Sequence, residues 1–341
     1  MPLLEARHLR VDLHTHRGTA TAVRDVGFAL ERGDTLGLIG ESGCGKSLTA
    51  LALMGLAPDN ARVSGSLLLD GHQLLDLPER DWRRIRGARI AMIFQEPMTA
   101  LNPVHRVGVQ VAEPLRLHQR LSARTAHAQA VALLERVGIA DAAQRADHFP
   151  HQFSGGQRQR IMIAMALAGA PDVLVADEPT TALDATVQQQ VLALIRELVA
   201  ERGMALLLIS HDLGLVAQNV QRLMVMYGGM VVEHGPAVQV FARPAHPYTR
   251  GLLAARPSLA HRLLAHRSER LPTIAGSVPE LFALPPGCPF AGRCAFTDAV
   301  CTTQAPPSVP VSAQHVFCCH RPEVVTKIAT NATTRVAGVA G

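Results

Sequence analysis

The sequence predicts an α/β fold in which the strands of a mixed sheet alternate with helices. Three observations support this prediction. Short apolar runs of strand length recur at 34–39, 88–94, 172–177 and 204–209. Helix-forming stretches lie between these runs. A glycine-rich segment at 40–47 joins the first run to a helical one, and this strand–loop–helix order is typical of a phosphate-binding loop.

A small antiparallel β subdomain is expected beside this core. Residues 9–13 and 26–30 alternate apolar and polar side chains with a period of two. Residues 61–75 have a hairpin-like pattern with a turn at Asp70 and Gly71.

The segment 40–47 has the pattern G-x-x-x-x-G-K-S. Its glycines allow successive backbone N–H groups to face phosphate oxygens, and the following helix adds positive partial charge at its N-terminus. We expect Lys46 to bind the β- and γ-phosphates and the Ser47 hydroxyl to bind Mg²⁺. The residues expected to bind the nucleotide here are Gly40, Glu41, Ser42, Gly43, Cys44, Gly45, Lys46 and Ser47.

Helices are expected to form a further subdomain at about 96–165. The apolar run 88–94 ends at Gln95, after which the strand pattern breaks. From about 107 to 138 the spacing of apolar residues is helical. Another helix is expected at 158–169, where Ile161 to Ala170 forms a long apolar stretch.

This last helix is preceded by Ser154, Gly155, Gly156 and Gln157. A serine at this place is a good N-cap, because its hydroxyl can accept a hydrogen bond from a free backbone N–H group. The paired glycines leave further N–H groups open to an anion. The pattern therefore indicates a second anion-facing helix N-terminus.

Two adjacent carboxylates, Asp177 and Glu178, end the apolar strand 172–176. Ligands bind at the carboxyl ends of strands in open α/β sheets. We expect Asp177 to hold Mg²⁺, directly or through water, and Glu178 to polarise an attacking water as a general base. His211 follows the strand 204–209, so it is expected at the same edge in contact with the γ-phosphate.

The composition is that of a soluble globular protein. The chain has 341 residues, of which 48% are hydrophobic and 18% charged, and its net charge is +5. No apolar run could span a bilayer, and the N-terminus does not have the pattern of a signal peptide. A basic run lacks the aromatic ladder that single-stranded nucleic acid requires, so we expect a solvated helix face. Its members are Arg80, Arg83, Arg84, Arg86 and Arg89. We expect a cytoplasmic protein that binds no nucleic acid and reaches a membrane only through a partner.

Five of the six cysteines crowd into the C-terminal quarter, which in a cytoplasmic chain indicates a metal site rather than disulfides. They are Cys288, Cys294, Cys301, Cys318 and Cys319. The spacing is C-x₅-C-x₆-C-x₁₇-C if Cys319 is the fourth ligand. Zinc ribbons favour C-x₂-C pairs, which this segment lacks, whereas four thiolates can hold a 4Fe–4S cluster. Zinc and free thiols remain alternatives, and the small segment is expected to need a metal to fold.

Taken in order, these motifs resemble those of the ATP-binding subunits of ABC transporters. The resemblance implies a P-loop NTPase fold of ABC type that binds ATP and Mg²⁺. Gln95 resembles the glutamine that contacts Mg²⁺ and the attacking water, so Ser47, Gln95 and Asp177 are the expected Mg²⁺ ligands. His211 resembles the switch histidine, and Glu178, His211 and Gln95 are the residues expected to take part in catalysis.

The same resemblance implies that one chain cannot complete an ATP site. Ser154 to Gln157 resemble the signature motif, which binds the γ-phosphate of the nucleotide held by the opposite subunit. Asp184 resembles an aspartate at that dimer interface. The implied mechanism is closure of two such domains around two ATP molecules, followed by hydrolysis and opening.

One segment departs from the family pattern. The family usually stacks the adenine ring on an aromatic side chain near residues 13–16, which here are Leu13, His14, Thr15 and His16. An imidazole of His14 or His16 is expected to substitute, or Leu13 to supply apolar contact alone.

Residues beyond the core motifs resemble the oligopeptide/dipeptide importer ATPases. The resemblance lies in 241–253 (FARPAHPYTRGLL), 95–103 (QEPMTALNP) and 184–188 (DATVQ). It implies that Cys288, Cys294, Cys301 and Cys319 hold a 4Fe–4S cluster.

The expected domain organisation follows from these motifs. Residues 1–235 form a nucleotide-binding domain, which closes after a strand pair at 222–227 and 230–233. Residues 236–322 form a small metal-stapled C-terminal extension, and the polar, alanine-rich tail 323–341 is expected to be disordered.

The implied function is ATP hydrolysis that energises the uptake of di- or oligopeptides. The implied partners are a second ATPase subunit in a heterodimer, two membrane permeases and an extracytoplasmic solute-binding protein. The chain would then lie peripherally on the cytoplasmic face of the inner membrane, with the surface at 95–113 receiving a permease helix. The alternatives are a nickel, opine or glutathione importer of the same type, and a soluble ABC ATPase that acts on nucleic acid or ribosomes.

Overall fold

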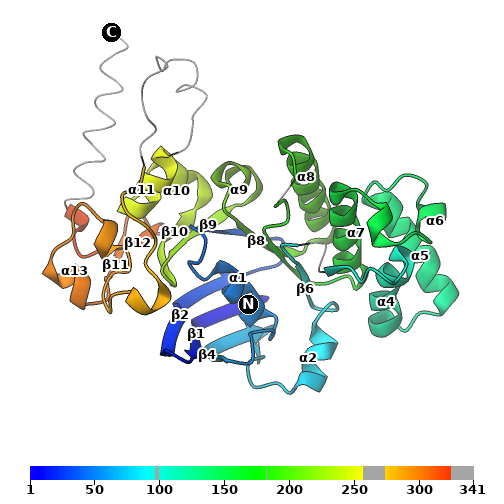
Figure 1. Ribbon diagram of the computed structural model, residues 1–341, viewed down its shortest axis with the longest axis horizontal. Helices are drawn as coiled ribbons and strands as arrows, with labels where there is room; N and C mark the ends of the chain where they lie inside the picture. Colours follow the sequence, from blue (N-terminus) through cyan, green and yellow to red (C-terminus); the bar gives the residue numbers. More distant parts are fainter. Residues whose placement is uncertain (97–99, 182, 256–272, 324–341) are drawn as a thin grey trace, which may run out of the picture.

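Two sheets lie at the centre of the computed structural model, which describes residues 1–96, 100–181, 183–255 and 273–323 (Figure 1). The larger sheet has eight strands in the order β11-β12-β10-β9-β3-β8-β7-β6. Its middle is parallel, because β3 pairs in parallel with β8 and β9, and β7 pairs in parallel with β6 and β8. The strands of this sheet within the first 236 residues are β3 (Thr35–Ile39), β6 (Ile90–Ile93), β7 (Val173–Asp177), β8 (Ala205–Ser210), β9 (Arg222–Tyr227) and β10 (Met230–Pro236).

The parallel strands are buried on both faces, which explains why they are continuous apolar runs. Along β8, Leu206 and Leu208 belong to one hydrophobic core, and Leu207 and Ile209 belong to the other. The first core is completed by the helices shown above the sheet in Figure 1, and the second by α1 and the smaller sheet below it. The helices concerned are α1 (Lys46–Leu53), α8 (Ala185–Arg202), α9 (Leu213–Asn219) and α10 (Ala237–Ala242).

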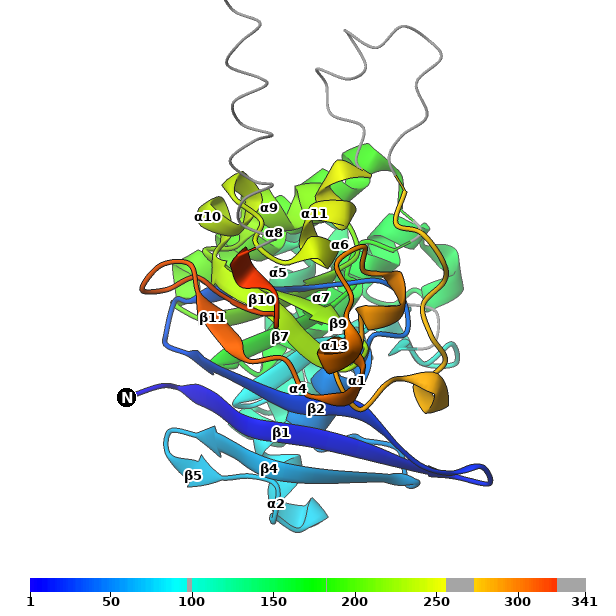
Figure 2. The same cartoon turned by 90° about the vertical axis from the view of Figure 1, so that its left-hand side faces the viewer.

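The smaller sheet is antiparallel and has the order β2-β1-β4-β5, as Figure 2 shows from the side. This confirms the predicted antiparallel subdomain. The first two strands are longer than predicted. A bulge near His8, whose φ is 51°, shifts the register of β1 and interrupts the period-two alternation just before residues 9–13, so the pattern does not reveal where the strand begins. The strands are β1 (Leu4–Thr15), β2 (Gly18–Leu30), β4 (Ala61–Leu69) and β5 (His72–Gln73). A short helix, α2 (Glu79–Ile85), follows β5.

The helical subdomain lies at the far right of Figure 1, beyond β6. The segment predicted to be helical, about 107–138, forms two helices. The chain turns at Arg120, whose φ is 55°, and Ser122 caps the second helix by accepting a hydrogen bond from the N–H of Thr125. Apolar residues of both helices share one core. The elements are α4 (Val107–Gln119), α5 (Ala123–Arg136), α6 (Ala142–Arg145), the 3₁₀ turn η1 (Pro150–Gln152) and α7 (Gly155–Ala168).

The residues from 236 to 322, which we call the C-terminal extension, add two strands to the main sheet. Strand β12 pairs antiparallel with β10, and β11 pairs with β12. The extension is therefore continuous with the core rather than a separate appendage. Its elements after α10 are α11 (Pro247–Ala254), η2 (Leu281–Ala283), η3 (Ala291–Arg293), α13 (Ala299–Thr303), β11 (Ser308–Pro310) and β12 (Val316–Cys318). Only Glu323 of the tail predicted to be disordered is described, and 324–341 lie outside the described residues.

A buried carboxylate joins the extension to the sheet. The side chain of Glu233 on β10 is 0% exposed and accepts hydrogen bonds from the backbone N–H groups of Ala245 and His246 at 2.7 and 2.8 Å. It also pairs with His315 at 2.7 Å. Burial lowers the pKa of His246 to about 4, so its ring stays neutral and its Nδ1 accepts the N–H of Tyr248 at the start of α11. Glu233 thus fixes the turn that leads into α11.

Replacing Glu233 with alanine is expected to destabilise the protein by about 3 kcal/mol, because two buried N–H groups and a buried histidine lose their partner. Urea unfolding measures this change, and limited proteolysis should locate the first cleavage in the extension. The control is Asp147→Ala, which breaks an exposed ion pair with Arg106 and should cost about 0.5 kcal/mol or less. Equal losses in the two variants would show that Glu233 does not anchor the extension.

Candidate active site

The phosphate-loop segment lies where β3 ends and α1 begins, and its backbone packs directly on two neighbouring strands. A Cβ at Gly40 would lie 2.2 Å from the carbonyl oxygen of Met226 on β9. Gly45 has a φ of 103°, and a Cβ there would lie 2.7 Å from the carbonyl oxygen of Ala22 on β2. No side chain fits at either position, so the two glycines set how closely the loop wraps around the helix N-terminus.

Lys46 lies under this loop rather than in solvent. It is 5% exposed, and its ammonium group donates to the carbonyl oxygens of Gly40 and Glu41 at 2.9 and 3.1 Å. Cys44 is 1% exposed beside it, and burial raises the pKa of the thiol. A buried ammonium held by backbone carbonyls is available to exchange these weak partners for phosphate oxygens.

Asp177 lies at the end of β7 and is 3% exposed. Burial raises the pKa of its carboxyl, a hydrogen bond with Ser47 opposes that rise, and the nearby Glu178 adds to it. Its Oδ1 atom is buried without a hydrogen-bond partner. A buried carboxylate oxygen without a donor is unfavourable unless a cation binds it. The donor set of Asp177 and Ser47 therefore fits the predicted Mg²⁺ site.

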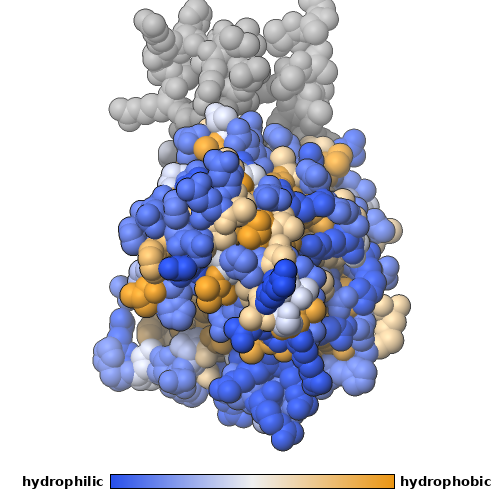
Figure 3. Space-filling view, turned by 90° about the vertical axis from the view of Figure 1, so that its right-hand side faces the viewer, coloured by the Kyte–Doolittle hydropathy of each residue, from blue (hydrophilic) through white to orange (hydrophobic). Residues whose placement is uncertain are grey.

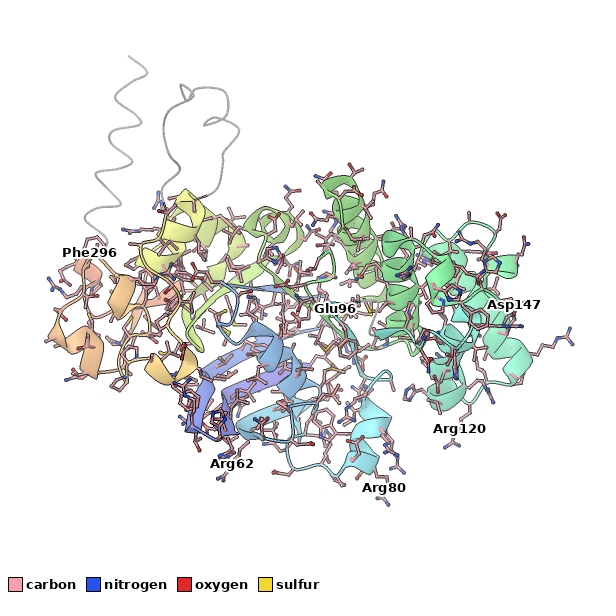
Figure 4. The ribbon with its side chains drawn as sticks, in the orientation of Figure 1. Arg62, Arg80, Glu96, Arg120, Asp147 and Phe296 are labelled. Atoms are coloured by element: carbon pink, nitrogen blue, oxygen red, sulfur yellow. The ribbon has the colours of Figure 1, made fainter. Side chains whose placement is uncertain are left out.

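The structure brings the three side chains predicted for catalysis together. Oε2 of Glu178 accepts a hydrogen bond from the Gln95 side chain at 3.2 Å and lies 3.1 Å from Nδ1 of His211. Gln95 comes from the end of β6, and His211 from the end of β8. In Figure 4 the neighbouring Glu96 is labelled near the middle of the molecule, where the sheet meets the helical subdomain. The carboxyl edge of the parallel strands thus gathers all three residues.

Two features of this cluster were not predicted from the sequence. The backbone of Glu178 has a φ of 47°, which is unusual for a residue with a side chain and is typical of strained functional sites. The hydroxyl of Thr181 donates to the same Oε2 atom at 3.0 Å. The contact of Thr181 could have been suspected from the sequence, because it lies three residues after Glu178. The positive φ of Glu178 could not, because glutamate rarely adopts this conformation.

The predicted signature residues begin a helix, as expected from the serine. Ser154 caps α7 by accepting the N–H of Gln157, and Gln157 accepts the N–H of Ser154 in return. Ser154 and Gly155 are exposed. Asp184 is also exposed and caps α8 by accepting the N–H groups of Thr186 and Val187. The hydroxyl of Ser154 and the carboxylate of Asp184 thus serve their own helices and lie on the outside of the molecule.

The segment expected to contact a nucleotide base has no phenylalanine, tyrosine or tryptophan. His14 is exposed at the end of β1, and its Nδ1 lies 2.9 Å from the hydroxyl of Thr19. Leu13, in the same strand, is partly exposed. Contact of His14, His16 or Leu13 with a nucleotide base stays a prediction.

The four cysteines predicted as ligands line one small cavity in the extension. They are Cys288, Cys294, Cys301 and Cys319. All are free thiols, and burial raises the pKa of Cys288 to about 12. Cys318 does not line the cavity, and its sulfur lies near the carbonyl oxygen of Val231. Within the described ranges, however, no three His, Cys, Asp or Glu side chains are close enough to form a metal-binding group. The predicted metal staple is thus not established by the geometry, although the donor set suits a thiolate-bound group.

Two family models match the chain. The model described as "ABC transporter" matches residues 23–181, and "Oligopeptide/dipeptide transporter, C-terminal region" matches residues 232–301. The chain is similar to a putative peptide import ATP-binding protein of Brucella abortus, with 53% identity over 306 residues, which is 89% of this chain and 91% of the relative. It is also similar to the oligopeptide transport ATP-binding protein OppD of Salmonella typhimurium, with 48% identity over 94% of each chain.

Solved structures show the same fold. A dimeric structure of a bacterial ABC transporter cassette matches with a TM-score of 0.62 and 26% identity, covering 69% of this chain and 98% of the cassette. A dimeric post-hydrolysis state of an ATP-binding cassette bound to ADP and Pi matches with a TM-score of 0.62 and 25% identity over the same shares. The predicted mixed-sheet fold with its β and helical subdomains is confirmed.

The raised pKa of Asp177 predicts that this residue lowers the stability of the folded protein at neutral pH. Because its folded-state pKa lies above the ordinary value of 3.8, ionisation of this carboxyl opposes folding. The loss of stability is absent below the ordinary pKa, grows as the pH rises, and is complete above the folded-state pKa. In metal-free buffer at pH 7, Asp177→Asn is expected to raise the free energy of unfolding by about 1 kcal/mol.

The gain should shrink as the pH is lowered toward the ordinary pKa of an aspartate. The control is Asp212→Asn at the exposed N-cap of α9, where aspartate and asparagine cap almost equally well. A loss of stability in Asp177→Asn at pH 7 would contradict the role given to burial.

Proposed function

Because the chain belongs to the family of ABC transporter ATP-binding proteins with an oligopeptide/dipeptide transporter C-terminal region, we propose that it hydrolyses ATP to energise the import of di- or oligopeptides. One observation carries the proposal. The similarity to peptide import ATP-binding proteins extends over about nine-tenths of both chains, and thus includes the extension as well as the nucleotide site. The ATPase itself follows from the cassette, whereas peptides as the solute rest on the relatives.

The phosphate end of the site is assigned to the loop and to Asp177. Lys46 exchanges its backbone carbonyl partners for the β- and γ-phosphates, and the N–H groups of 40–47 face the phosphate oxygens. Ser47, Asp177 and Gln95 would hold Mg²⁺, which when bound offsets the negative charge of the phosphates. The support in this chain is the unpartnered, buried oxygen of Asp177.

Glu178 is assigned as the general base. Its carboxylate is held by Gln95, Thr181 and His211, so its orientation is fixed before a water binds. His211 is 64% exposed and can turn toward the γ-phosphate. Gln95 lies between the base and the start of the helical subdomain, so it can report the state of the site to that subdomain.

We assign the far side of each ATP site to a partner ATPase. Ser154 to Gln157 and Asp184 are exposed or partly exposed at two helix N-termini, where they suit a nucleotide bound to another subunit. Two of the solved cassettes that this chain matches are dimeric. In keeping with the motif at 95–103, the proposed partner is a second, different ATPase. Pro97 to Thr99 of that motif lie outside the described residues.

Membrane permeases are the proposed partners of the helical side. Among the described residues no helix is long and apolar enough to cross a membrane. Figure 3 faces the helical side and shows apolar residues scattered over a mostly hydrophilic surface. Val104, Val109 and Leu117, in or before α4, are 73%, 50% and 67% exposed. These side chains suit a cytoplasmic helix of a permease. The proposed location of the chain is therefore peripheral, on the cytoplasmic face of the inner membrane. An extracytoplasmic binding protein would deliver the peptide.

Residues 1–235 are proposed as the nucleotide-binding domain and 236–322 as the extension. In the extension, Cys288, Cys294, Cys301 and Cys319 are proposed to hold a 4Fe–4S cluster, with zinc as the alternative. The support is the convergence of these four thiols, and not of Cys318, on one cavity. Their function would be to staple a segment with a small core.

The Glu178→Gln variant tests the proposed function as a whole. Glutamine keeps the hydrogen bonds but cannot take a proton, so ATP should bind normally while its hydrolysis falls by about 100-fold or more. Uptake of a labelled tripeptide by cells that carry the variant should fall together with hydrolysis. Near-normal hydrolysis would remove Glu178 as the base. Lost hydrolysis with unchanged peptide uptake would remove peptide import as the function.

Two adjacent cysteines, Cys318 at the end of β12 and Cys319 directly after it, give a matched test of the cluster. Protein purified without oxygen is expected to be brown and to contain about four iron and four sulfide ions per chain. Cys319→Ser should lose the colour and the iron, whereas Cys318→Ser should keep both. Colourless wild-type protein that contains zinc, or loss of iron in Cys318→Ser, would contradict the assignment.

A further inference from the structure

The phosphate loop is held from outside the nucleotide-binding core by side chains of the C-terminal extension. Glu41, the second residue of the loop, is the point of contact. Its carboxylate pairs with the guanidinium of Arg293 at 2.6 and 3.4 Å, through one bond to each carboxylate oxygen. Its backbone N–H donates to the hydroxyl of Tyr248 at 2.8 Å. The two partners lie 207 and 252 residues away in the sequence.

Both partners are rigidly placed. The side chain of Arg293 is 7% exposed, and its remaining N–H groups donate to the carbonyl oxygens of Ile274 and Ala275 and to the hydroxyl of Tyr227. Tyr248 is 0% exposed in α11 and packs against Tyr227 at 4.6 Å between ring centres. A two-bonded guanidinium–carboxylate pair with this little exposure is strong and directional.

The aromatic cluster ties these contacts to the extension's own fold. Phe290 packs on both tyrosines, at 5.2 and 5.4 Å between ring centres. It directly precedes η3, whose last residue is Arg293. On the other side, Glu233 fixes the turn that starts α11 and thereby places Tyr248. The contacts on Glu41 therefore belong to a packed core and not to a mobile surface.

The charge of Glu41 gives these contacts a consequence for ATP. Its carboxylate is 25% exposed and belongs to the loop that is assigned to the phosphates. An unpaired carboxylate there would repel a polyphosphate bound in the same loop, since like charges in a partly buried site repel more strongly than in water. Arg293 neutralises it. The carbonyl of the same residue accepts a hydrogen bond from Lys46, so the position of Glu41 also sets the starting place of the phosphate-binding ammonium.

We propose that Arg293 and Tyr248 are positioning residues for the ATPase reaction, which hold the phosphate loop in its binding shape through Glu41 and cancel the charge of that residue. This rests on the assignment of 40–47 as the nucleotide site. Both residues act through Glu41 and not through contact with ATP. The nucleotide affinity of the core therefore depends on whether the extension is folded.

The test measures Mg-ATP affinity by calorimetry and the KM and kcat of ATP hydrolysis in the full-length protein. Arg293→Gln should weaken ATP binding by about 10-fold, because the loop loses its anchor and gains a bare charge. KM should rise in parallel, while kcat at saturating ATP stays within about twofold, because bound phosphates then order the loop. Tyr248→Phe, which keeps the packed ring, should weaken binding by about threefold.

A second substitution separates this role from simple loss of structure. Adding Glu41→Gln to Arg293→Gln removes the bare charge, so the double variant should bind ATP more tightly than Arg293→Gln alone, at about threefold below wild type. The matched control is Arg321→Gln, which breaks an ion pair with Asp298 inside the extension and should leave affinity unchanged.

Three outcomes would overturn the inference. They are wild-type affinity in Arg293→Gln, a double variant that binds no better than Arg293→Gln, and an equal loss of affinity in Arg321→Gln. If the wild-type protein itself bound no ATP, the assignment of 40–47 as the nucleotide site would be wrong. That result is distinguishable from failure of this inference, because it is seen without any variant.

Discussion

The close packing of the phosphate loop on strands β9 and β2 is the constraint on which the rest of the molecule depends. At Gly40 and Gly45 there is no space for a side chain between the loop and the neighbouring carbonyl oxygens. The tight turn of the loop therefore requires the strands around it to be in place, and β3, which leads into the loop, lies in the middle of the larger sheet. On one side of β3, the parallel strands β8, β7 and β6 end at the same edge. Polar residues lie at or just after their ends: His211 after β8, Asp177 and Glu178 at the end of β7, and Gln95 after β6.

This arrangement places strain and unpaired charge where chemistry needs them. The buried Asp177 has an oxygen without a donor, and Glu178 has an unusual backbone conformation. Both are unfavourable for folding, and the buried strands around them supply the compensating stability. The extension contributes from the outside. It adds strands to the edge of the sheet and holds Glu41 by hydrogen bonds and an ion pair. A segment remote from the ATP motifs in sequence is therefore packed directly against the phosphate loop.

The sequence predicted the elements better than the contacts between them. Buried parallel strands are apolar runs, and the G-x-x-x-x-G-K-S pattern between a strand and a helix is specific to phosphate binding, so the sheet and the loop were predictable. The strand ends placed Glu178 and His211 at one edge, whereas the role expected for Gln95 came from the family resemblance. The bulge near His8 and the break at Arg120 were not, because both depend on a positive φ in residues that rarely adopt one. The contacts of Arg293 and Tyr248 with Glu41 were missed because they join residues more than 200 positions apart. No local pattern records such a pairing.

The most direct test of the nucleotide site is calorimetric titration of wild-type protein and of Lys46→Ala with Mg-ATP. We predict saturable binding to the wild type and a loss of about 100-fold or more in the variant, because the ammonium beneath the loop is the charge that meets the phosphates. The variant should remain folded, because the buried sheet does not depend on this side chain. Its circular dichroism spectrum, which reports the secondary structure, checks this. Equal affinities in the two proteins would contradict the assignment of the loop as the nucleotide site.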